Sequence, residues 1–464
     1  MASQSTAERA ELMGSEKIPK LLFQFAGPAI LMMLVSSLYN IVDKIFVGQF
    51  MGDAGLAGAT MVGPVMRIIT AFAILIGAGG NALLALRLGE GRHEEAETIL
   101  NNSFLVAGGL SILLTIAAQV FSRPILLAFG CDEATMVYAL PYLHIVAMAA
   151  FFETMTSGMG LFIRTDGKPR YMMLCSITGC VVNIILDPVL IAVVHLGIRG
   201  AAFATAFSQF ISGTLVLCYF TVSKSSTIRL RLHLMKLNLP LTWTSIKLGF
   251  SSFLQQFLGG ISQSILYACL ARYAGGRDAV SYSVAVASVG VTTGVGLLFV
   301  LPVLGLQTAI QPIIGYNYGA NKYDRVLKTL WSGIGLAIGL SCIGWIVILV
   351  FAEPLALIFG AEDYVAHAAW TMRVYNITLP LMALSALGSN FYQSIGKPTH
   401  AVLLGMSRQV LCLIPACLIL PLFLGQRGVI WAIPVADVVS FALSLVMLLR
   451  ESRRMRRESA RLAA

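Results

Sequence analysis

Long apolar stretches alternate with short polar connections along the whole chain. A bilayer core about 30 Å thick needs roughly 20 apolar helical residues to cross it. Twelve stretches reach that length, so the pattern predicts an all-α integral membrane protein with twelve transmembrane helices. The predicted spans are residues 21–47, 54–86, 99–121, 134–162, 171–194, 201–222, 242–271, 279–312, 328–351, 365–393, 401–424 and 428–449.

Composition indicates that lipid surrounds most of the surface. Apolar residues make up 57% of the 464 residues and charged residues 12%, against about 45–50% and about 25% in soluble domains. The formal charge of +10 is compatible with nucleic-acid binding, but the basic residues collect in short segments between apolar stretches, as juxtamembrane loops do. We therefore expect contact with membrane lipid and none with nucleic acid.

The distribution of lysine and arginine predicts the orientation. Of the 32 basic residues, 23 fall in the two tails and the even-numbered connections or near the adjoining span ends, and six fall in or near the connections on the opposite side. Because cytoplasmic loops carry the excess of lysine and arginine, we expect both termini in the cytoplasm and the protein in the cell inner (plasma) membrane.

Signals for metal, disulfide and nucleotide chemistry are missing from the sequence. The eight cysteines include no CxxC pair, and the six histidines are scattered, so we expect neither a metal site nor a disulfide framework. No GxxxxGK[ST] motif occurs, so ATP is not the direct energy source. We expect a transporter rather than an enzyme, with no cofactor, driven by a gradient of H+ or Na+.

The second half of the chain repeats the first. Five short motifs return in the same order at offsets of 230 to 228 residues, among them Gly167-Lys168-Pro169 as Gly396-Lys397-Pro398. Six spans per half is an even number, so the halves enter from the same side and form parallel, pseudo-symmetric six-helix bundles. Such bundles suit alternating access around a central cavity. The expected parts are a cytoplasmic tail (1–20), an N-lobe (21–222), a cytoplasmic linker (223–241), a C-lobe (242–449) and a basic cytoplasmic tail (450–464).

Four acidic residues lie inside predicted spans and are candidates for function by default, because a carboxylate there costs at least a few kcal/mol. They are Asp43, Glu153, Asp187 and Asp437. Asn183 lies one turn before Asp187, so the two side chains share a helix face. In the next span Ala201 and Thr205 form a second stripe with Gln209.

These groups predict a cluster of hard oxygen ligands for a proton or a transient Na+ ion at Asp43, Asn183, Asp187 and Thr205. The alternative is that the polar groups only hold helices together. Glu153 has two interpretations, attraction of a cationic substrate or a salt bridge with an intramembrane arginine. Asp437 fits polar packing as well as function. Pro28, inside the first span, predicts a kink and is a hinge candidate.

Two runs resemble signatures of the multidrug and toxic compound extrusion (MATE) family. Residues 39–48, Tyr-Asn-Ile-Val-Asp-Lys-Ile-Phe-Val-Gly, resemble its helix 1 signature. Residues 311–320, Gln-Pro-Ile-Ile-Gly-Tyr-Asn-Tyr-Gly-Ala, resemble the signature after helix 8. The resemblance covers essentially the whole chain. It implies a secondary active antiporter that exports small organic cations and lipophilic drugs in exchange for H+ or Na+.

In the family branch that the sequence resembles, the coupling cation lies in the N-terminal lobe. The resemblance implies that Asp43, Asn183, Asp187, Ala201 and Thr205 form that site. A second branch uses a glutamate on helix 7 and an aspartate on helix 10. Here helix 7 offers only Gln255 and Gln256, and helix 10 has no acid within its span. Tyr39 and Gln256 join Glu153 as candidates for lining the substrate cavity, and we expect a monomer.

Two other functions compete with drug export. A lipid-linked oligosaccharide flippase of the same superfamily would favour a cavity rich in arginine, but intramembrane acids outnumber arginines here by four to three. A membrane-embedded transferase would need clustered acids to bind a magnesium diphosphate. The adjacent acidic pairs are helix openers, apart from Glu94-Glu95 in a cytoplasmic loop, so the transferase is disfavoured.

Overall fold

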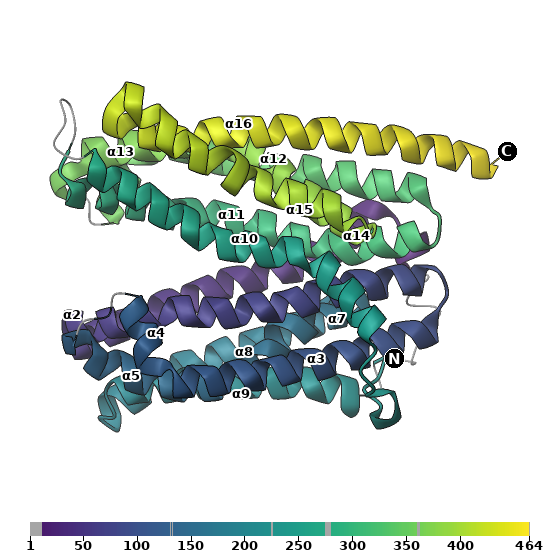
Figure 1. Ribbon diagram of the computed structural model, residues 1–464, viewed down its shortest axis with the longest axis horizontal. Helices are drawn as coiled ribbons and strands as arrows, with labels where there is room; N and C mark the ends of the chain where they lie inside the picture. Colours follow the sequence, from purple (N-terminus) through teal and green to yellow (C-terminus); the bar gives the residue numbers. More distant parts are fainter. Residues whose placement is uncertain are drawn as a thin grey trace. The chain divides into compact units, whose positions relative to one another are not determined.

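The computed structural model describes residues 12–129, 131, 133–223, 226–273, 280–359 and 362–463, and over these ranges all regular secondary structure is helical (Figure 1). The chain divides into two compact units. The first unit consists of Gly27–Phe253 with the described residues up to Glu16, and the second of Leu254–Ala464 with Lys17–Ala26.

The helices of the first half are long, with local breaks in the fourth predicted span. They are α2 (Ile18–Gly89), α3 (His93–Val120), α4 (Ser122–Ala128), α5 (Glu133–Met148), α6 (Ala150–Thr154), the π-helix η1 (Met155–Met159), α7 (Gly160–Thr165), α8 (Pro169–Pro188), the π-helix η2 (Val189–Val193), α9 (Ile198–Thr221) and the 3-10 turn η3 (Leu232–Leu234).

The second half continues in the same manner. Its helices are α10 (Leu239–Arg272), α11 (Tyr282–Gly319), α12 (Tyr323–Ile358), the 3-10 turn η4 (Glu362–Tyr364), α13 (Val365–Tyr375), α14 (Leu379–Ser394), α15 (Pro398–Met406), the π-helix η5 (Ser407–Leu413) and α16 (Ile414–Ala463).

Each of the twelve predicted spans is helical over most of its length in the described ranges. Eight helices of the described chain are by themselves long and apolar enough to cross a membrane, and a ninth span results if the bent pair Thr135–Met148 and Ala150–Thr165 is counted as one. One predicted connection differs, because helical backbone continues through residues 48–53 within α2. That segment contains no proline, so nothing in it removes a backbone donor.

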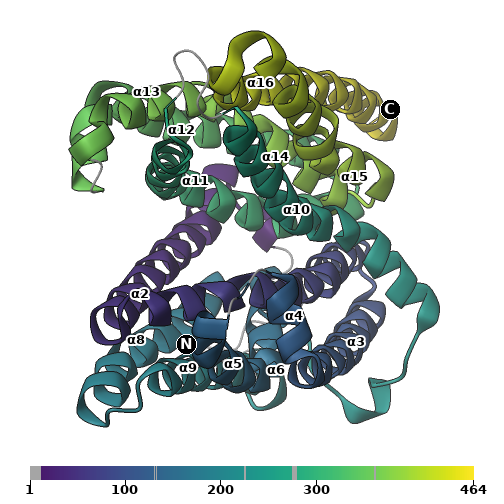
Figure 2. The same cartoon turned by 60° about the vertical axis from the view of Figure 1, so that its left-hand side comes forward.

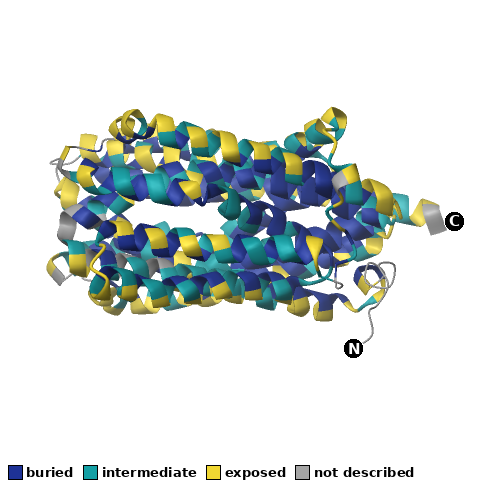
Figure 3. Cartoon of the chain, turned by 90° about the horizontal axis from the view of Figure 1, so that it is seen from below, coloured by how far each residue is buried: buried dark blue, intermediate teal, exposed yellow. Residues whose placement is uncertain are grey.

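The outer surface of the helices is apolar, as expected if lipid is the solvent. Within each unit the buried residues gather on inward-facing helix faces, and exposed residues lie on the outer faces (Figure 3). Large hydrophobic side chains are found on that exposed surface, for example Phe23 at 82% and Phe423 at 79% exposure. A water-soluble protein rarely exposes so much contiguous apolar surface.

The backbone confirms the internal repeat. Gly167 and Gly396 both have positive φ, +78° and +75°. Gly197 (φ +56°, ψ −134°) and Gly425 (φ +57°, ψ −144°) share a second unusual conformation. Phe121 interrupts the helical backbone at φ −103°, ψ 20°, and its repeat partner Phe351 does so at φ −105°, ψ 22°. Equal dihedral angles at equivalent positions show that the two halves fold by the same plan.

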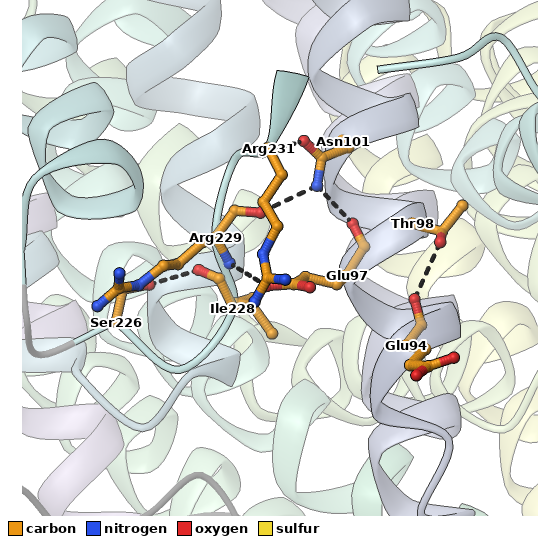
Figure 4. Close-up of polar contacts among 8 residues, drawn as sticks. All are labelled: Glu94, Glu97, Thr98, Asn101, Ser226, Ile228, Arg229 and Arg231. Atoms are coloured by element: carbon orange, nitrogen blue, oxygen red, sulfur yellow. Dashed lines mark hydrogen bonds and ion pairs between the residues drawn. The ribbon is translucent and has the colours of Figure 1, made fainter. Parts of the chain in front are cut away.

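The predicted inter-lobe linker lies along the start of α3 (Figure 4). The Asn101 amide donates to the Arg229 carbonyl oxygen at 2.9 Å, and its side-chain oxygen accepts from the Arg231 backbone N–H at 2.8 Å. Glu97 accepts from the Arg229 N–H at 3.1 Å and pairs with the Arg231 guanidinium at 3.2 Å. These contacts satisfy backbone groups that a connection outside regular structure would otherwise leave to water.

A buried aspartate fixes the beginning of the same linker. Asp166 is 3% exposed and accepts hydrogen bonds from the Tyr219 hydroxyl at 2.6 Å and the Thr227 backbone N–H at 3.0 Å. The Ser226 and Thr227 hydroxyls also donate to it. Within the first unit, therefore, side-chain hydrogen bonds hold the beginning of the linker against the helices.

Candidate cation site

Two polar side chains on α8 form the centre of the site. Asn183 and Asp187 are one helical turn apart, and both are completely buried in the first unit. Helix α9 lies beside α8 (Figures 1 and 2). The four-residue spacing therefore directs both groups toward the neighbouring helix, as the sequence predicted.

The Asn183 amide joins the two helices. In the orientation that satisfies both of its polar atoms, its nitrogen donates to Asp187 Oδ2 at 3.0 Å, and its oxygen accepts from the Thr205 backbone N–H at 3.3 Å. Thr205 is 6% exposed, and Ala201, one turn earlier on α9, is fully buried. The structure thus brings Asn183, Asp187 and Thr205 together, with Ala201 one turn away on α9.

Asp43, from α2, completes the carboxyl pair. Its carboxyl lies against that of Asp187, close enough for a hydrogen bond when one of the two holds a proton. The phenol of Tyr142, on α5, lies beside Thr205 and both acids. Two carboxylates this close repel each other in a poorly hydrated site, so the pair favours a bound cation or a shared proton.

Several oxygens at the site have unused capacity to bind a cation. Asp187 Oδ1, Thr205 Oγ1 and Gln209 Oε1 are buried without a hydrogen-bond partner. Buried oxygens are usually paired, so their presence beside two acids fits a cation ligand set. Among the described residues no three His, Cys, Asp or Glu side chains cluster in a way that could hold a metal ion.

Glu153 lies on α6, one turn after the 58° bend between Met148 and Ala150. Its Oε1 accepts a hydrogen bond from the Ser157 hydroxyl at 2.6 Å and another from the Thr70 hydroxyl at 3.4 Å. In the described part of the chain no arginine pairs with it. Tyr39 lies within electrostatic range of Glu153, Asp43 and Tyr142.

Gln256 and Pro28 were predicted for other roles, the first as a cavity-lining residue and the second as a hinge. Gln256 is exposed, while the adjacent Gln255 donates to the Ser389 hydroxyl at 3.1 Å. Pro28 lies within α2, whose helix continues through it. The hinge at Pro28 stays a prediction.

Sequence reasoning missed Tyr142, Thr70 and Ser157. Tyr142 follows Pro141 in an apolar span, and one tyrosine there gives no signal of a site. Thr70 and Ser157 are hydroxyl residues in helices, and such residues most often bond their own backbone. Only the packed structure reveals these contacts, because it places α5 against α9 and brings Thr70 of α2 and Ser157 of η1 to Glu153 of α6.

Comparison with known proteins identifies the family. The model of the MatE family matches residues 28–189 and 253–419. The chain belongs to the MatE family. Members of this family are multi-pass membrane transporters and not enzymes.

Relatives and solved structures cover nearly the whole MatE chain. It is 25% identical over 427 residues to the multidrug export protein MepA of Staphylococcus haemolyticus (strain JCSC1435), covering 92% of each protein. It is 26% identical over 445 residues to MepA of Staphylococcus aureus (strain MSSA476), covering 94% of this chain and 95% of that protein. A crystal structure of a MATE in the bent conformation superposes with a TM-score of 0.90 at 21% identity, covering 99% of this chain and 100% of the other.

Proposed function

We propose that the protein is a secondary active multidrug exporter that acts as a monomer and exchanges cationic lipophilic compounds for H+ or Na+ by alternating access. Two similar relatives bear the name multidrug export protein, which supports efflux as the direction and drugs as the substrate class. The acids inside its spans favour organic cations over anionic lipid-linked sugars.

The contact between Asp43 and Asp187 carries the proposal. Two adjacent carboxyls, one fully buried and one half-buried, hold a proton or a sodium ion in one conformation, because otherwise their charges repel at low dielectric. When the other conformation exposes the site to water, both carboxyls can ionise and the bound proton or sodium ion is released. Transport is coupled if the two conformations differ in ion affinity, and the contact between the acids provides a physical source of that difference.

The two candidate ions need different ligands. A proton needs only the carboxyl pair, whereas Na+ also needs neutral oxygens such as the unpartnered Thr205 hydroxyl. Efflux of a fluorescent organic cation from vesicles containing the purified protein, with sodium and proton gradients imposed separately, tests the proposal. Export driven by either gradient supports it. Export driven by neither, together with translocation of a lipid-linked oligosaccharide, would contradict it.

Glu153 is proposed to attract the cationic substrate. We expect Glu153→Gln to reduce transport of dications more than transport of monocations, because a dication loses more electrostatic attraction with each removed charge. The measurement is the ratio of initial efflux rates for a matched pair of substrates. Gln retains an acceptor for Ser157 and Thr70, so the helix contacts survive. An equal loss for both substrates would refute a role in recognising charge.

The proposed location is the inner membrane with both termini in the cytoplasm. His233, in the linker, and His195, between α8 and α9, are both exposed. We expect a cysteine at 233 to react with an impermeant maleimide only from the cytoplasmic side, and a cysteine at 195 only from outside. The Cys-substituted proteins are compared in intact cells and inverted vesicles, on a background with the native cysteines replaced. The reverse labelling pattern would overturn the orientation.

A further inference from the structure

The second unit contains a carboxylate in the membrane that is already paired. Asp437, on α16, is 3% exposed. Its Oδ1 accepts from the Arg408 guanidinium Nε at 2.5 Å, and its Oδ2 accepts from the Thr378 hydroxyl at 2.7 Å. Both carboxylate oxygens therefore have a donor, in contrast to Asp187.

Backbone irregularities surround this pair. Thr378 lies in the break between α13 and α14, and Arg408 lies in the π-helix η5. Irregular backbone at membrane depth persists only where protein or a polar cavity surrounds it, and broken helices form ion and substrate sites in transporters. The Ser407 and Ser440 hydroxyls are 3.0 Å apart, and Ser440 donates to Ser385 at 3.2 Å. These contacts hold the same three segments in register.

The internal repeat relates this cluster to the cation site. Thr378 corresponds to Ala149, where the fourth predicted span bends, at an offset of 229. Asp437 corresponds to Gln209, one turn after Thr205, and Arg408 corresponds to Cys180, at an offset of 228. The equivalent positions of the first unit therefore carry no charge, and the pair of an acid and a cation occurs in the second unit at positions that are neutral in the first.

The electrostatic surroundings of Asp437 are simple. In the described part of the chain, Arg408 is the cation within ion-pair distance of Asp437. The Arg408 side chain is 25% exposed. Tyr375, from α13, is the titratable group that interacts with both members of the pair. Tyr267 and Cys417 lie next to Tyr375. None of these neighbours is a second acid, so one guanidinium balances the charge.

We propose that Arg408 is a tethered cation that fills a second small-cation site, formed by Asp437 and Thr378, and thereby keeps the second unit from taking up a coupling ion. With Arg408 removed, the same oxygens bind H+ or Na+. That the second unit adds no coupling ion to the transport cycle rests on the proposed function. That Arg408 occupies the site formed by Asp437 and Thr378 does not. The alternative is a purely structural ion pair, whose loss leaves a buried charge that nothing compensates.

Carboxyl labelling distinguishes these two possibilities without measuring transport. Dicyclohexylcarbodiimide reacts with protonated carboxyls in apolar surroundings, and mass spectrometry locates the product. In the purified wild-type protein Asp437 should stay unlabelled, because the Arg408 guanidinium and the Thr378 hydroxyl each occupy one of its carboxylate oxygens. In Arg408→Met we expect labelling of Asp437 to rise at least about tenfold, since the unpaired carboxyl takes up a proton. Added Na+ should lower that labelling if the opened site also binds sodium.

A matched pair in the same unit provides the control. Arg373 pairs with Glu353 at 3.3 Å, but Glu353 is 59% exposed. Because water and not an apolar environment surrounds this carboxyl, we expect no rise in its labelling in Arg373→Met. In Arg408→Met/Asp437→Asn this labelling should disappear and thermal stability should recover relative to Arg408→Met, because removing both partners leaves no buried charge. The result should persist in an Asp187→Asn background, which separates it from the first site.

The outcome that overturns the proposal is an unlabelled Asp437 in folded Arg408→Met. Arg408→Gln, which keeps one donor toward the carboxylate, is the second variant if the methionine protein does not fold. If neither single variant folds at any pH or Na+ concentration while the double variant does, Asp437 cannot acquire a free cation. The pair is then structural only.

Discussion

We expect Asp187→Asn to abolish ion-coupled export while the protein still folds and binds substrate. The asparagine carbonyl can accept the hydrogen bond that Asn183 donates to Asp187 Oδ2 at 3.0 Å, so the packing of α8 on α9 survives. The contact with Asp43 then contains only one carboxyl, which removes the charge repulsion that makes ion affinity depend on conformation. Gradient-driven efflux and equilibrium binding of the same fluorescent cation measure the two properties separately.

Asp166→Asn is the matched control for this variant. It makes the same chemical change at a buried aspartate of the same unit, but Asp166 holds the linker through Tyr219 and Thr227. Loss of charge-assisted hydrogen bonds should lower its thermal stability, by about 1.5–3 kcal/mol for each bond lost, without uncoupling the folded molecules. Near-normal coupled export by well-folded Asp187→Asn would refute the site.

A second large effect is expected at Gly249, where α10 crosses α2 in the first unit. A Cβ atom at Gly249 would collide with the Leu75 carbonyl oxygen, and one at Gly79 would collide with the Ser245 carbonyl oxygen. Close approach of backbones through small residues is a recurrent means of helix packing in membranes. Gly249→Val must push two backbones apart, so we expect a loss of about 3 kcal/mol or more and little monodisperse protein.

The same substitution elsewhere on α10 separates steric collision from a general effect of valine. A Cβ at Gly259 would meet no atom within 4 Å, so Gly259→Val should leave thermal unfolding in detergent close to that of the wild type. If the two variants unfold at the same temperature, the crossing at Gly249 does not contribute to stability in the way the structure implies.

The predicted elements and the half-repeat were largely correct because their signals are local. An apolar stretch of membrane-spanning length requires a helix, and the repeat appears in the structure as equal dihedral angles at Gly197 and Gly425. The continuation of α2 through residues 48–53 differed from the prediction. The prediction ended one span at residue 47 and began the next at 54, but the segment between them has no proline to break the helix.

The site was predictable only in part. The four-residue spacing of Asn183 and Asp187 placed both on one face of α8. Asp43, Ala201 and Thr205 were candidates from their places inside the spans, and the resemblance to the MATE family implied that they form one site with Asn183 and Asp187. Nothing in the sequence indicated that Tyr142 would lie beside them. Arg408 and Asp437 were both recognised as charged residues inside spans, yet their pairing across 29 positions was not predicted.

The sequence by itself determined the membrane-spanning helices, the duplication of the six-helix plan, and which polar side chains share a helix face. Tertiary structure decided which faces meet: Asp43 against Asp187, Arg408 against Asp437, and the linker against α3. The physical reason is that helical periodicity depends on neighbours three and four residues away. The crossing and register of two helices depend on the summed packing of side chains that lie far apart in the chain.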